Sequence, residues 1–450
     1  MSQRESAIII HPALANSQSV RSPEARLAEA TGLAAAIDLD IAGAEIIPVV
    51  QPRPATLIGG GKVEDINAQL DALDPRPGLV IVDGALSPVQ HRNLEKAWNA
   101  KVLDRTALIL EIFGERAQTA EGRLQVALAH LEYQRSRLVR SWTHLERQRG
   151  GAGFLCGPGD RQIESDRRAL ANKIDRLKKN LDHVRRTRTL QRAQRKRAPH
   201  PVVALVGYTN AGKSTLFNAL TKADVTAQDQ LFATLDPTMR AVELSAGGRM
   251  VLSDTVGFIS ELPTQLVASF RATLEEVLEA DILVHVRDIS HPDTEAERAD
   301  VLSVLNELGL ADDDDRLVIE ALNKVDRLDD EDRAAYEAVV RASDTEAAGT
   351  LESPLQVLTS AQTGAGLGAL LEMIERALTA AHETLEFETP MSDGAARAWL
   401  HQHADVLDER ADGPVMAILA RLSKKAEGQF AKAFPNIDIK TPVEKARKIA

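Results

Sequence analysis

A glycine-rich segment, GYTNAGKST at residues 207–215, constrains the fold of this chain more strongly than any other feature. The apolar run VVALVG (202–207) leads into it, as expected for a buried parallel strand, and the helix-forming sequence LFNALTKA (216–223) follows it. This strand–loop–helix context is the one that the P-loop motif requires. Its glycines let consecutive backbone N–H groups approach phosphates closely, and the helix N-terminus adds a partial positive charge. The segment therefore predicts an α/β domain that binds the phosphates of a nucleotide.

The loop supplies the expected phosphate ligands. They are Gly207, Tyr208, Thr209, Asn210, Ala211, Gly212, Lys213, Ser214 and Thr215. Two side chains have more specific expected roles, because the Lys213 ammonium can reach the β- and γ-phosphates and the Ser214 hydroxyl can bind Mg²⁺. The motif thus implies Mg²⁺ as the cofactor.

A second motif, DTVG, begins at Asp254 and ends the apolar run MVL (250–252), as expected for a strand end that faces the nucleotide. The Asp254 carboxylate is expected to hold Mg²⁺, directly or through water. The Gly257 amide is expected to contact the γ-phosphate. So short a motif indicates a nucleotide site only because it follows a P-loop and lies at a strand end.

The loop between these motifs contains Phe232, Ala233 and Thr234, which are also expected near the phosphates. A threonine here can bind Mg²⁺ and become ordered when the γ-phosphate is present, which is switch behaviour. Thr234 is preferred to Thr238 for this role because the strand-like sequence AVELSA starts soon after Thr238.

The base is expected to be guanine. Asn323, Lys324 and Asp326 form an NKVD motif at the end of an apolar run. A carboxylate accepts from the paired N1–H and N2–H groups of guanine, whereas adenine offers neither and would leave the carboxylate unpaired. Ser360 and Ala361 follow the apolar run LQVL, where a backbone N–H can bind guanine O6.

The residue after Gly257 is Phe258, at a position where many GTPases carry a glutamine that orients the attacking water. A phenylalanine ring cannot do this. The motifs therefore assign no catalytic residue, and we expect hydrolysis by the isolated chain to be slow and to need a partner.

Residues 115–198 combine helical periodicity with positive charge. Apolar residues recur at the coiled-coil spacing in two runs, and the sequence RGGAGFLCGPGD (149–160) separates them, which predicts a helical hairpin with a glycine-rich tip. The runs are Leu124, Leu128, Leu131, Leu138, Trp142 and Leu145, then Ile163, Leu170, Ile174, Leu177, Leu181 and Val184. Residues 135–200 contain 19 Lys and Arg but 6 Asp and Glu, although the whole chain has a net charge of −12. A salt-bridged solvated face would need more acids, so this charge favours a surface that faces RNA.

The rest of the chain suggests further domains. Expected strands at 7–11, 45–50, 79–83 and 101–104 alternate with expected helices at 24–37, 62–72 and 88–99, which indicates a parallel α/β layer. A helix near 394–404 and two strands around the turn ADG are expected near the end of the chain. The expected organisation is an N-terminal α/β domain (1–114), the basic hairpin (115–198), the nucleotide-binding domain (199–380) and a small C-terminal domain with a Lys-rich tail (381–450).

Composition and the ends of the chain restrict its location. No apolar run is long enough to span a membrane, and the polar start MSQRES lacks the features of a signal peptide. The single cysteine, Cys156, cannot form an internal disulfide and is interpreted as an incidental thiol. We therefore expect a cytoplasmic protein, and a monomer.

Together these segments resemble the HflX family of ribosome-associated GTPases. Several matching blocks lie outside the nucleotide-binding motifs, among them LSPVQHRNLE (86–95), DRTALILEIFGERAQTAEGRLQVALAHLEY (104–133) and GPGDRQIESDRR (157–168). The resemblance implies an N-terminal α/β domain, a long hairpin, a GTPase domain and a small C-terminal α/β piece. It also implies binding to the large (50S) ribosomal subunit, with the hairpin tip reaching ribosomal RNA, and a role in dissociating or rescuing stalled ribosomes.

The chain departs from the family pattern at three positions. Cys156 stands where a basic residue is usual, Asp160 where glutamate is usual, and Arg287 lies in a strand that is usually apolar. Three readings of function remain open on the residues: a GTP-dependent ribosome factor, a GTP-gated RNA-binding or remodelling module, and a ribosome assembly factor. The basic hairpin fits all three, because phosphate contacts do not depend on base sequence.

Overall fold

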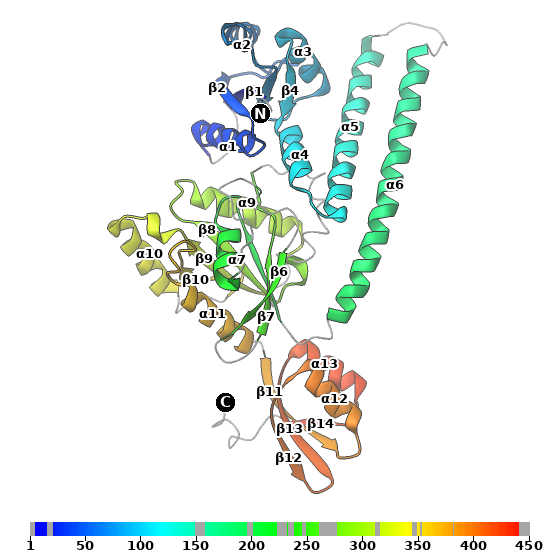
Figure 1. The fold of residues 1–450 in the computed structure, drawn as a ribbon, viewed down its shortest axis with the longest axis vertical. Helices are drawn as coiled ribbons and strands as arrows, with labels where there is room; N and C mark the ends of the chain where they lie inside the picture. Colours follow the sequence, from blue (N-terminus) through cyan, green and yellow to red (C-terminus); the bar gives the residue numbers. More distant parts are fainter. Residues whose placement is uncertain are drawn as a thin grey trace.

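The computed structural model has three β-sheets arranged along one long axis, with a helical hairpin running beside them (Figure 1). It describes residues 5–15, 21–148, 158–195, 201–222, 232, 238–244, 249–260, 277–310, 316–343, 349–351, 353–380 and 382–440. The predicted α/β architecture is confirmed: an N-terminal α/β region, the hairpin, a central P-loop domain and a small C-terminal α/β domain. Within the described residues, no helix has the length and apolar character needed to cross a membrane.

The N-terminal region is a parallel sheet with the strand order β2-β1-β3-β4. Its strands are β1 (Ser6–Leu14), β2 (Asp40–Val49), β3 (Leu79–Val82) and β4 (Lys101–Asp104). Its helices are α1 (Pro23–Ala35), α2 (Gly60–Ala72), α3 (Pro88–Trp98) and α4 (Arg105–Arg116). The predicted alternation of strands and helices is confirmed, and α4 is a further helix that was not among the expected ones.

Alternation of side chains along β1 explains how helices cover both faces of this sheet. Ile8 and Ile10 belong to one apolar cluster, which includes Trp98 of α3. Ala7 and Ile9 belong to another, which includes Ile109 of α4. A strand buried on both faces is typical of a parallel sheet covered by helices.

The hairpin consists of α5 (Ala120–Gln148) and α6 (Pro158–Arg195), which lie side by side (Figure 1). The predicted apolar seam is confirmed at six of its positions. These are Leu124, Leu128, Leu131, Ile174, Leu177 and Leu181. The glycine-rich tip, with Cys156, lies outside the described residues.

The central sheet has the strand order β10-β9-β8-β5-β7-β6, and β6 alone pairs antiparallel to its neighbour among these strands. Its strands are β5 (Val202–Gly207), β6 (Thr238–Glu243), β7 (Arg249–Asp254), β8 (Ile282–Asp288), β9 (Leu317–Asn323) and β10 (Leu355–Leu358). Its helices are α7 (Lys213–Thr221), α9 (Thr294–Glu307), α10 (Asp330–Ser343) and α11 (Leu367–Ala380), with the short η1 (Val325–Arg327). The carboxyl ends of parallel strands share one edge of a sheet, so β5, β7, β9 and β10 bring the predicted motifs together.

The C-terminal domain is an antiparallel sheet with the order β12-β13-β11-β14. It contains β11 (His382–Pro390), α12 (Gly394–His403), β12 (Asp405–Asp412), β13 (Val415–Ser423), α13 (Lys424–Ala433) and β14 (Asp438–Lys440). Its core includes Phe387, Leu400, Ile418 and Phe430. The predicted helix and strand pair are confirmed.

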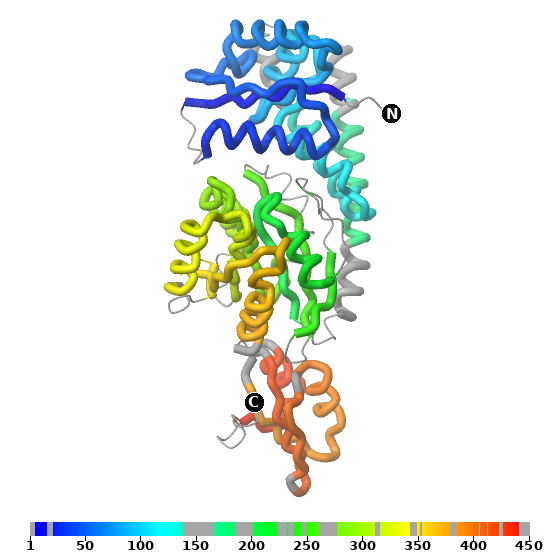
Figure 2. Tube along the Cα trace, turned by 60° about the vertical axis from the view of Figure 1, so that its left-hand side comes forward, coloured from blue at the N-terminus to red at the C-terminus, as the bar shows by residue number. Residues whose placement is uncertain are grey.

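The N-terminal region contacts the central domain directly. Helix α1 lies between the N-terminal sheet and the central domain (Figures 1 and 2). One apolar cluster continues from Phe113 of α4 to Phe232 of the central domain, whose rings meet edge to face with centroids 4.7 Å apart. The two parts therefore share a core.

Candidate functional site

The predicted P-loop joins β5 to α7, and two of its glycines are required by their positive φ values and by close neighbours. Gly207 has φ 153°, and a Cβ there would lie 2.3 Å from the carbonyl oxygen of Val286. Gly212 has φ 96°, and a Cβ there would lie 2.3 Å from Nδ2 of Asn323. Because no side chain fits at either position, the loop can wrap tightly and place its N–H groups at the helix N-terminus.

Lys213 points back into this loop. Its Nζ donates to the carbonyl oxygens of Gly207 at 3.1 Å and Tyr208 at 2.6 Å, and the residue is almost fully buried. Burial lowers the pKa of the Lys213 ammonium to about 8, and the nearby Asp254 carboxylate opposes that shift. A ligand anion beside Nζ would stabilise the charged ammonium in the same way.

Ser214 and Asp254 lie together although they are far apart in the sequence. Strands β5 and β7 pair in parallel, with Leu205 opposite Asp254, and the Ser214 hydroxyl donates to Oδ2 of Asp254 at 2.8 Å. A hydroxyl and a carboxylate are the oxygen ligands that Mg²⁺ takes beside nucleotide phosphates, so the residues fit this ion.

The segment after Asp254 packs directly against the P-loop. The Thr209 N–H donates to the carbonyl oxygen of Phe258 at 2.8 Å, and the Phe258 N–H donates to that of Gly207 at 3.1 Å. A Cβ on Gly257 would lie 2.9 Å from Cγ2 of Thr209 and 3.1 Å from Nζ of Lys213. The Phe258 ring is buried in the apolar core, so it offers no polar group to water.

The NKVD residues meet the P-loop and the Ser360–Ala361 segment at the ends of β9 and β10. Nδ2 of Asn323 donates to the carbonyl oxygen of Ala211 at 2.8 Å, while its Oδ1 accepts from the Ala361 N–H at 3.0 Å. The Ser360 hydroxyl donates to Oδ1 of Asp326. Asn323 therefore ties all three segments together, and the Asp326 carboxylate is oriented by Ser360.

Lys324 lies beside this junction in the left-handed conformation, with φ 66°. Its Nζ forms an ion pair with Oδ2 of Asp288, at the end of β8, at 2.7 Å. The aliphatic part of Lys324 is thereby held at the same edge of the sheet as Asn323.

Of the predicted switch segment, the structure describes one residue, Phe232. Ala233 and Thr234 lie outside the described residues. Phe232 has φ 58° and buries its ring against Phe113 of the N-terminal region, a contact that no sequence motif indicated.

Sequence reasoning missed a polar cluster that joins the P-loop to the N-terminal region. We call it the Tyr208 cluster, and its members are Arg21, Glu29, Arg105, Tyr208 and Ser260. The Tyr208 hydroxyl accepts from Nη1 of Arg21 at 2.7 Å and from the Ser260 N–H at 2.8 Å, and it donates to Glu29. Nη2 of Arg105 donates to Glu29 at 2.7 Å and to the hydroxyl of Ser260 at 2.8 Å.

Burial shapes the ionisation of this cluster. Burial and the Glu29 carboxylate raise the pKa of the Tyr208 hydroxyl above its ordinary value. Burial alone would raise the pKa of the Glu29 carboxyl, but Arg105, Tyr208 and Arg21 together lower it. The cluster therefore holds a neutral tyrosine between a carboxylate and two guanidinium groups. The sequence offered one signal for this cluster, the bulky Tyr208 inside a phosphate-binding loop. It gave no indication of the residues that contact Tyr208, because they belong to no motif.

Comparisons with known proteins place this geometry in a family. Residues 24–114 match a model described as GTP-binding GTPase N-terminal, 116–195 match GTP-binding GTPase Middle Region, and 202–324 match 50S ribosome-binding GTPase. A GTPase HflX from Magnetococcus marinus is 48% identical over 408 residues, which is 90% of this chain and 89% of that protein. The chain belongs to the HflX family of GTPases.

A second HflX protein and one solved structure are also similar to this chain. The GTPase HflX of Escherichia coli is 42% identical over 366 residues, covering 80% of this chain and 82% of that protein. A crystal structure of a GTP-binding protein from Sulfolobus solfataricus with GDP is 22% identical, with a TM-score of 0.45, and covers 84% of this chain and 99% of that one. Membership in the HflX family makes this chain a GTP hydrolase with a ribosome-binding GTPase domain.

Proposed function

We propose that this HflX-family protein associates with the large ribosomal subunit in a GTP-dependent manner and dissociates or rescues stalled ribosomes. Hydrolysis is slow in the isolated chain and is stimulated by that subunit. The proposal joins two features: a guanine-nucleotide site without the usual glutamine, and a hairpin with a large excess of positive charge.

At the phosphate end, the loop 207–215 surrounds the phosphates with its backbone N–H groups, except that of Thr209, which donates to Phe258, and the Lys213 ammonium neutralises the β- and γ-phosphates. The Gly257 amide contacts the γ-phosphate, and we assign Phe232, Ala233 and Thr234 to the switch segment that responds to it. Lys213 Nζ would lie 3.1 Å from a Cβ on Gly257, so the two residues are neighbours, which supports a shared phosphate.

Mg²⁺ is held by Ser214, Asp254 and Thr234, together with the phosphates. HflX belongs to the P-loop GTPases, which generally use Mg²⁺ with GTP, and the hydrogen bond between Ser214 and Asp254 brings two suitable oxygens together. When bound, the ion neutralises the charge that develops on the phosphates.

At the base end, Asp326 accepts from the N1–H and N2–H groups of guanine, and the Ala361 backbone lies beside O6. Asn323 aligns the three segments, and the aliphatic stem of Lys324 packs beside the base. The orienting hydrogen bond from Ser360 to Asp326 supports this assignment, because it fixes one carboxylate oxygen and leaves the other for the base.

The surface of α6 carries the ribosomal part of the proposal. Between residues 167 and 184, the exposed basic side chains are Arg167, Arg168, Lys173, Arg176, Lys178 and Lys179. The exposed acids over the same stretch are Asp175 and Asp182. Lys178 pairs with Glu132 of α5 at 3.0 Å, but the stretch as a whole keeps a surplus of cations, which favours a polyanion such as ribosomal RNA.

The decisive experiment measures single-turnover GTP hydrolysis with and without purified large subunits, using small subunits as the matched control. We expect stimulation by large subunits only. Sedimentation with GTP, with GDP and without nucleotide then separates the alternatives. Binding only to immature subunits would favour an assembly factor, and indifference to ribosomes would favour a GTP-gated RNA-binding module.

A charge variant tests the hairpin itself. Lys173→Gln combined with Lys179→Gln should weaken binding to large subunits about tenfold and reduce its salt dependence, because phosphate contacts release counterions. Arg333→Gln combined with Arg341→Gln on α10 removes the same charge elsewhere and should leave binding unchanged. Equal behaviour of the two variants would remove α6 from the interface.

A further inference from the structure

Thr209 is a P-loop residue with a buried hydroxyl that lacks a protein partner. Its exposed fraction is 5%, and Oγ1 forms no hydrogen bond within the part of the chain that the structure describes. Burying a hydroxyl without a partner is unfavourable, because the group loses its hydrogen bonds to water, so native structures rarely do so without a reason. A ligand that supplies the missing partner is such a reason.

The position of Thr209 identifies the part of the ligand that it meets. A Cβ on Gly257 would lie 2.9 Å from Cγ2, the methyl carbon of Thr209, and 3.1 Å from Nζ of Lys213, so both side chains border Gly257. The hydrogen bond from the Thr209 N–H to the Phe258 carbonyl, at 2.8 Å, holds the threonine there. Lys213 and Gly257 are the proposed γ-phosphate contacts, so the Thr209 side chain lies at the γ-phosphate end of the loop.

A hydroxyl at this end can perform a task that Phe258 cannot. The Phe258 ring is buried in the core and has no polar group. A hydroxyl can donate one hydrogen bond and accept others, so it can contact a phosphate oxygen and a water molecule together. Orientation of the attacking water is the step that the missing glutamine leaves open.

We propose that the Thr209 hydroxyl is a catalytic residue for GTP hydrolysis: it donates to a γ-phosphate oxygen and accepts from the attacking water. The water oxygen forms a bond to the γ-phosphorus as the bond to the β–γ bridging oxygen breaks, and that electron pair stays on GDP. The water protons end on the released phosphate and in solvent, and the Thr209 hydroxyl is unchanged. The proposal deepens the GTPase reaction and does not depend on the ribosomal role.

The test compares Thr209→Val, which keeps the β-branched shape and removes the hydroxyl, with Thr209→Ser, which keeps the hydroxyl. Single-turnover hydrolysis and the affinities for GDP and a non-hydrolysable GTP analogue are measured on the full chain. We expect Thr209→Val to lower kcat about 100-fold while its GDP affinity stays within about twofold, and Thr209→Ser to recover most of the rate.

Three results would overturn the proposal: an unchanged kcat in Thr209→Val, a Thr209→Ser rate as low as the valine variant, or a parallel loss of GDP affinity, which would mark a structural role. Thermal unfolding checks both variants, and if Thr209→Val does not fold, the rates of Thr209→Ala and Thr209→Ser decide instead. Stimulation of the wild-type chain by large subunits is scored separately, so a failed ribosomal role and a failed Thr209 role give different results.

Discussion

The hydroxyl of Tyr208, inside the P-loop, accepts a hydrogen bond from Arg21 of the N-terminal region at 2.7 Å. The Arg21 guanidinium also lies over the Tyr208 ring, 4.5 Å from its centroid, and its Nη2 pairs with Asp300 of α9 at 2.9 Å. The same side chain thus contacts both the loop and a helix of the GTPase domain. Contacts of this kind make the N-terminal region part of the structure that supports the nucleotide site.

Arg105 gives the first prediction, because it connects the same two parts through buried charges. It pairs with Glu29 at 2.7 Å and with Asp83 at 2.6 Å, and it donates to Ser260. Arg105→Ala leaves two buried carboxylates without their main cation, so we expect a loss of about 3–5 kcal/mol in the free energy of unfolding. Urea or thermal unfolding of the full chain measures it.

Two further variants make this result specific. Arg105→Lys keeps the charge and should lose less stability than alanine. Arg333→Ala removes an exposed arginine on α10 and should change stability by no more than about 0.5 kcal/mol. Equal stability of Arg105→Ala and the wild-type chain would mean that the Tyr208 cluster does not hold the two parts together.

Lys213 gives the second prediction. Lys213→Ala removes the buried ammonium that faces the β- and γ-phosphates, so nucleotide affinity should fall by at least about 100-fold. Fluorescence titration with a labelled GTP analogue measures the change. Lys222→Ala is the control, because it removes the same charge from an exposed position at the end of α7. This variant should bind the nucleotide with unchanged affinity. Unchanged affinity in Lys213→Ala would contradict the phosphate site.

The sequence predicted the nucleotide site well because its parts are local motifs at strand ends. Gly207 and Gly212 were marked by spacing, and both their positive φ values and the nearness of Val286 and Asn323 exclude a side chain there. Parallel strands then bring Asp254 and Asn323 to one edge without further information. Such contacts can be derived from the order of strands and loops.

The Tyr208 cluster could not be predicted in this way. Arg21, Glu29 and Arg105 lie on separate elements, and Ser260 lies 155 residues after Arg105. Nothing in their local spacing indicates that they meet, because the contact depends on how two parts of the chain dock. The hydroxyl of Thr209 shows the same limit, since a motif specifies the backbone path and says little about which side chains remain without partners.

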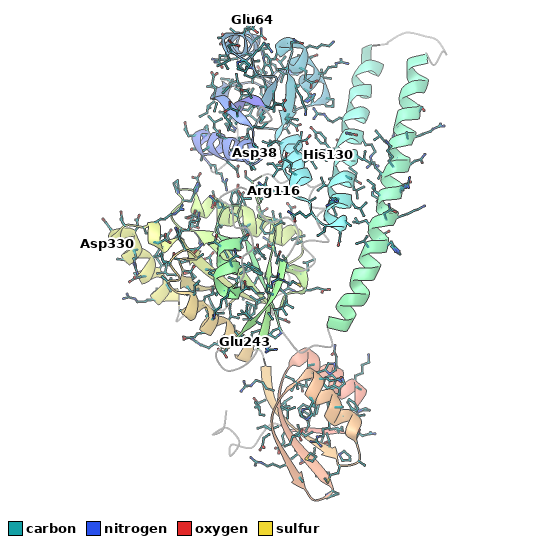
Figure 3. The ribbon with its side chains drawn as sticks, viewed as in Figure 1. Asp38, Glu64, Arg116, His130, Glu243 and Asp330 are labelled. Atoms are coloured by element: carbon teal, nitrogen blue, oxygen red, sulfur yellow. The ribbon has the colours of Figure 1, made fainter. Side chains whose placement is uncertain are left out.

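Asp326 gives the third prediction. Asp326→Asn replaces an acceptor with a donor at one carboxylate oxygen, so it should weaken GTP binding and improve binding of xanthosine triphosphate, whose ring presents an oxygen at C2. Competition between the two nucleotides for the same variant measures the ratio. Asp330→Asn is the control, because Asp330 lies at the outer side of the domain, at the start of α10 (Figure 3). A variant that still prefers GTP would refute the role given to Asp326.

The fourth prediction concerns a buried charge network in the central sheet, to which Arg287 of β8 belongs. Glu320 of β9 accepts from Arg287 at 3.2 Å and Arg298 at 3.0 Å, and His285 lies 3.5 Å away. The pKa of His285 is lowered from 6.5 to about 4, with burial as the largest cause; the nearby guanidinium groups also lower it, and Glu320 opposes them. His285 therefore stays neutral in the folded chain at neutral pH.

The sign of the pH dependence follows from this shift. Between pH 6.5 and 4 the unfolded chain binds a proton at His285 that the folded chain does not, so stability is full above pH 6.5 and is lost as pH falls towards 4. The total loss from this group is about 3 kcal/mol. Glu297 acts in the opposite direction, because burial raises its pKa to about 8, so the wild-type slope alone is not diagnostic.

The difference in pH-dependent stability between the wild-type chain and a His285 variant isolates the contribution of His285. His285→Gln removes the titrating group and keeps a polar side chain, so its free energy of unfolding should fall less steeply than that of the wild-type chain between pH 6.5 and 4. The matched control is His401→Gln, an exposed histidine in the C-terminal domain. Parallel slopes for the wild-type chain and His285→Gln would show that His285 is already protonated in the folded network, where the Glu320 carboxylate would then hold its charge.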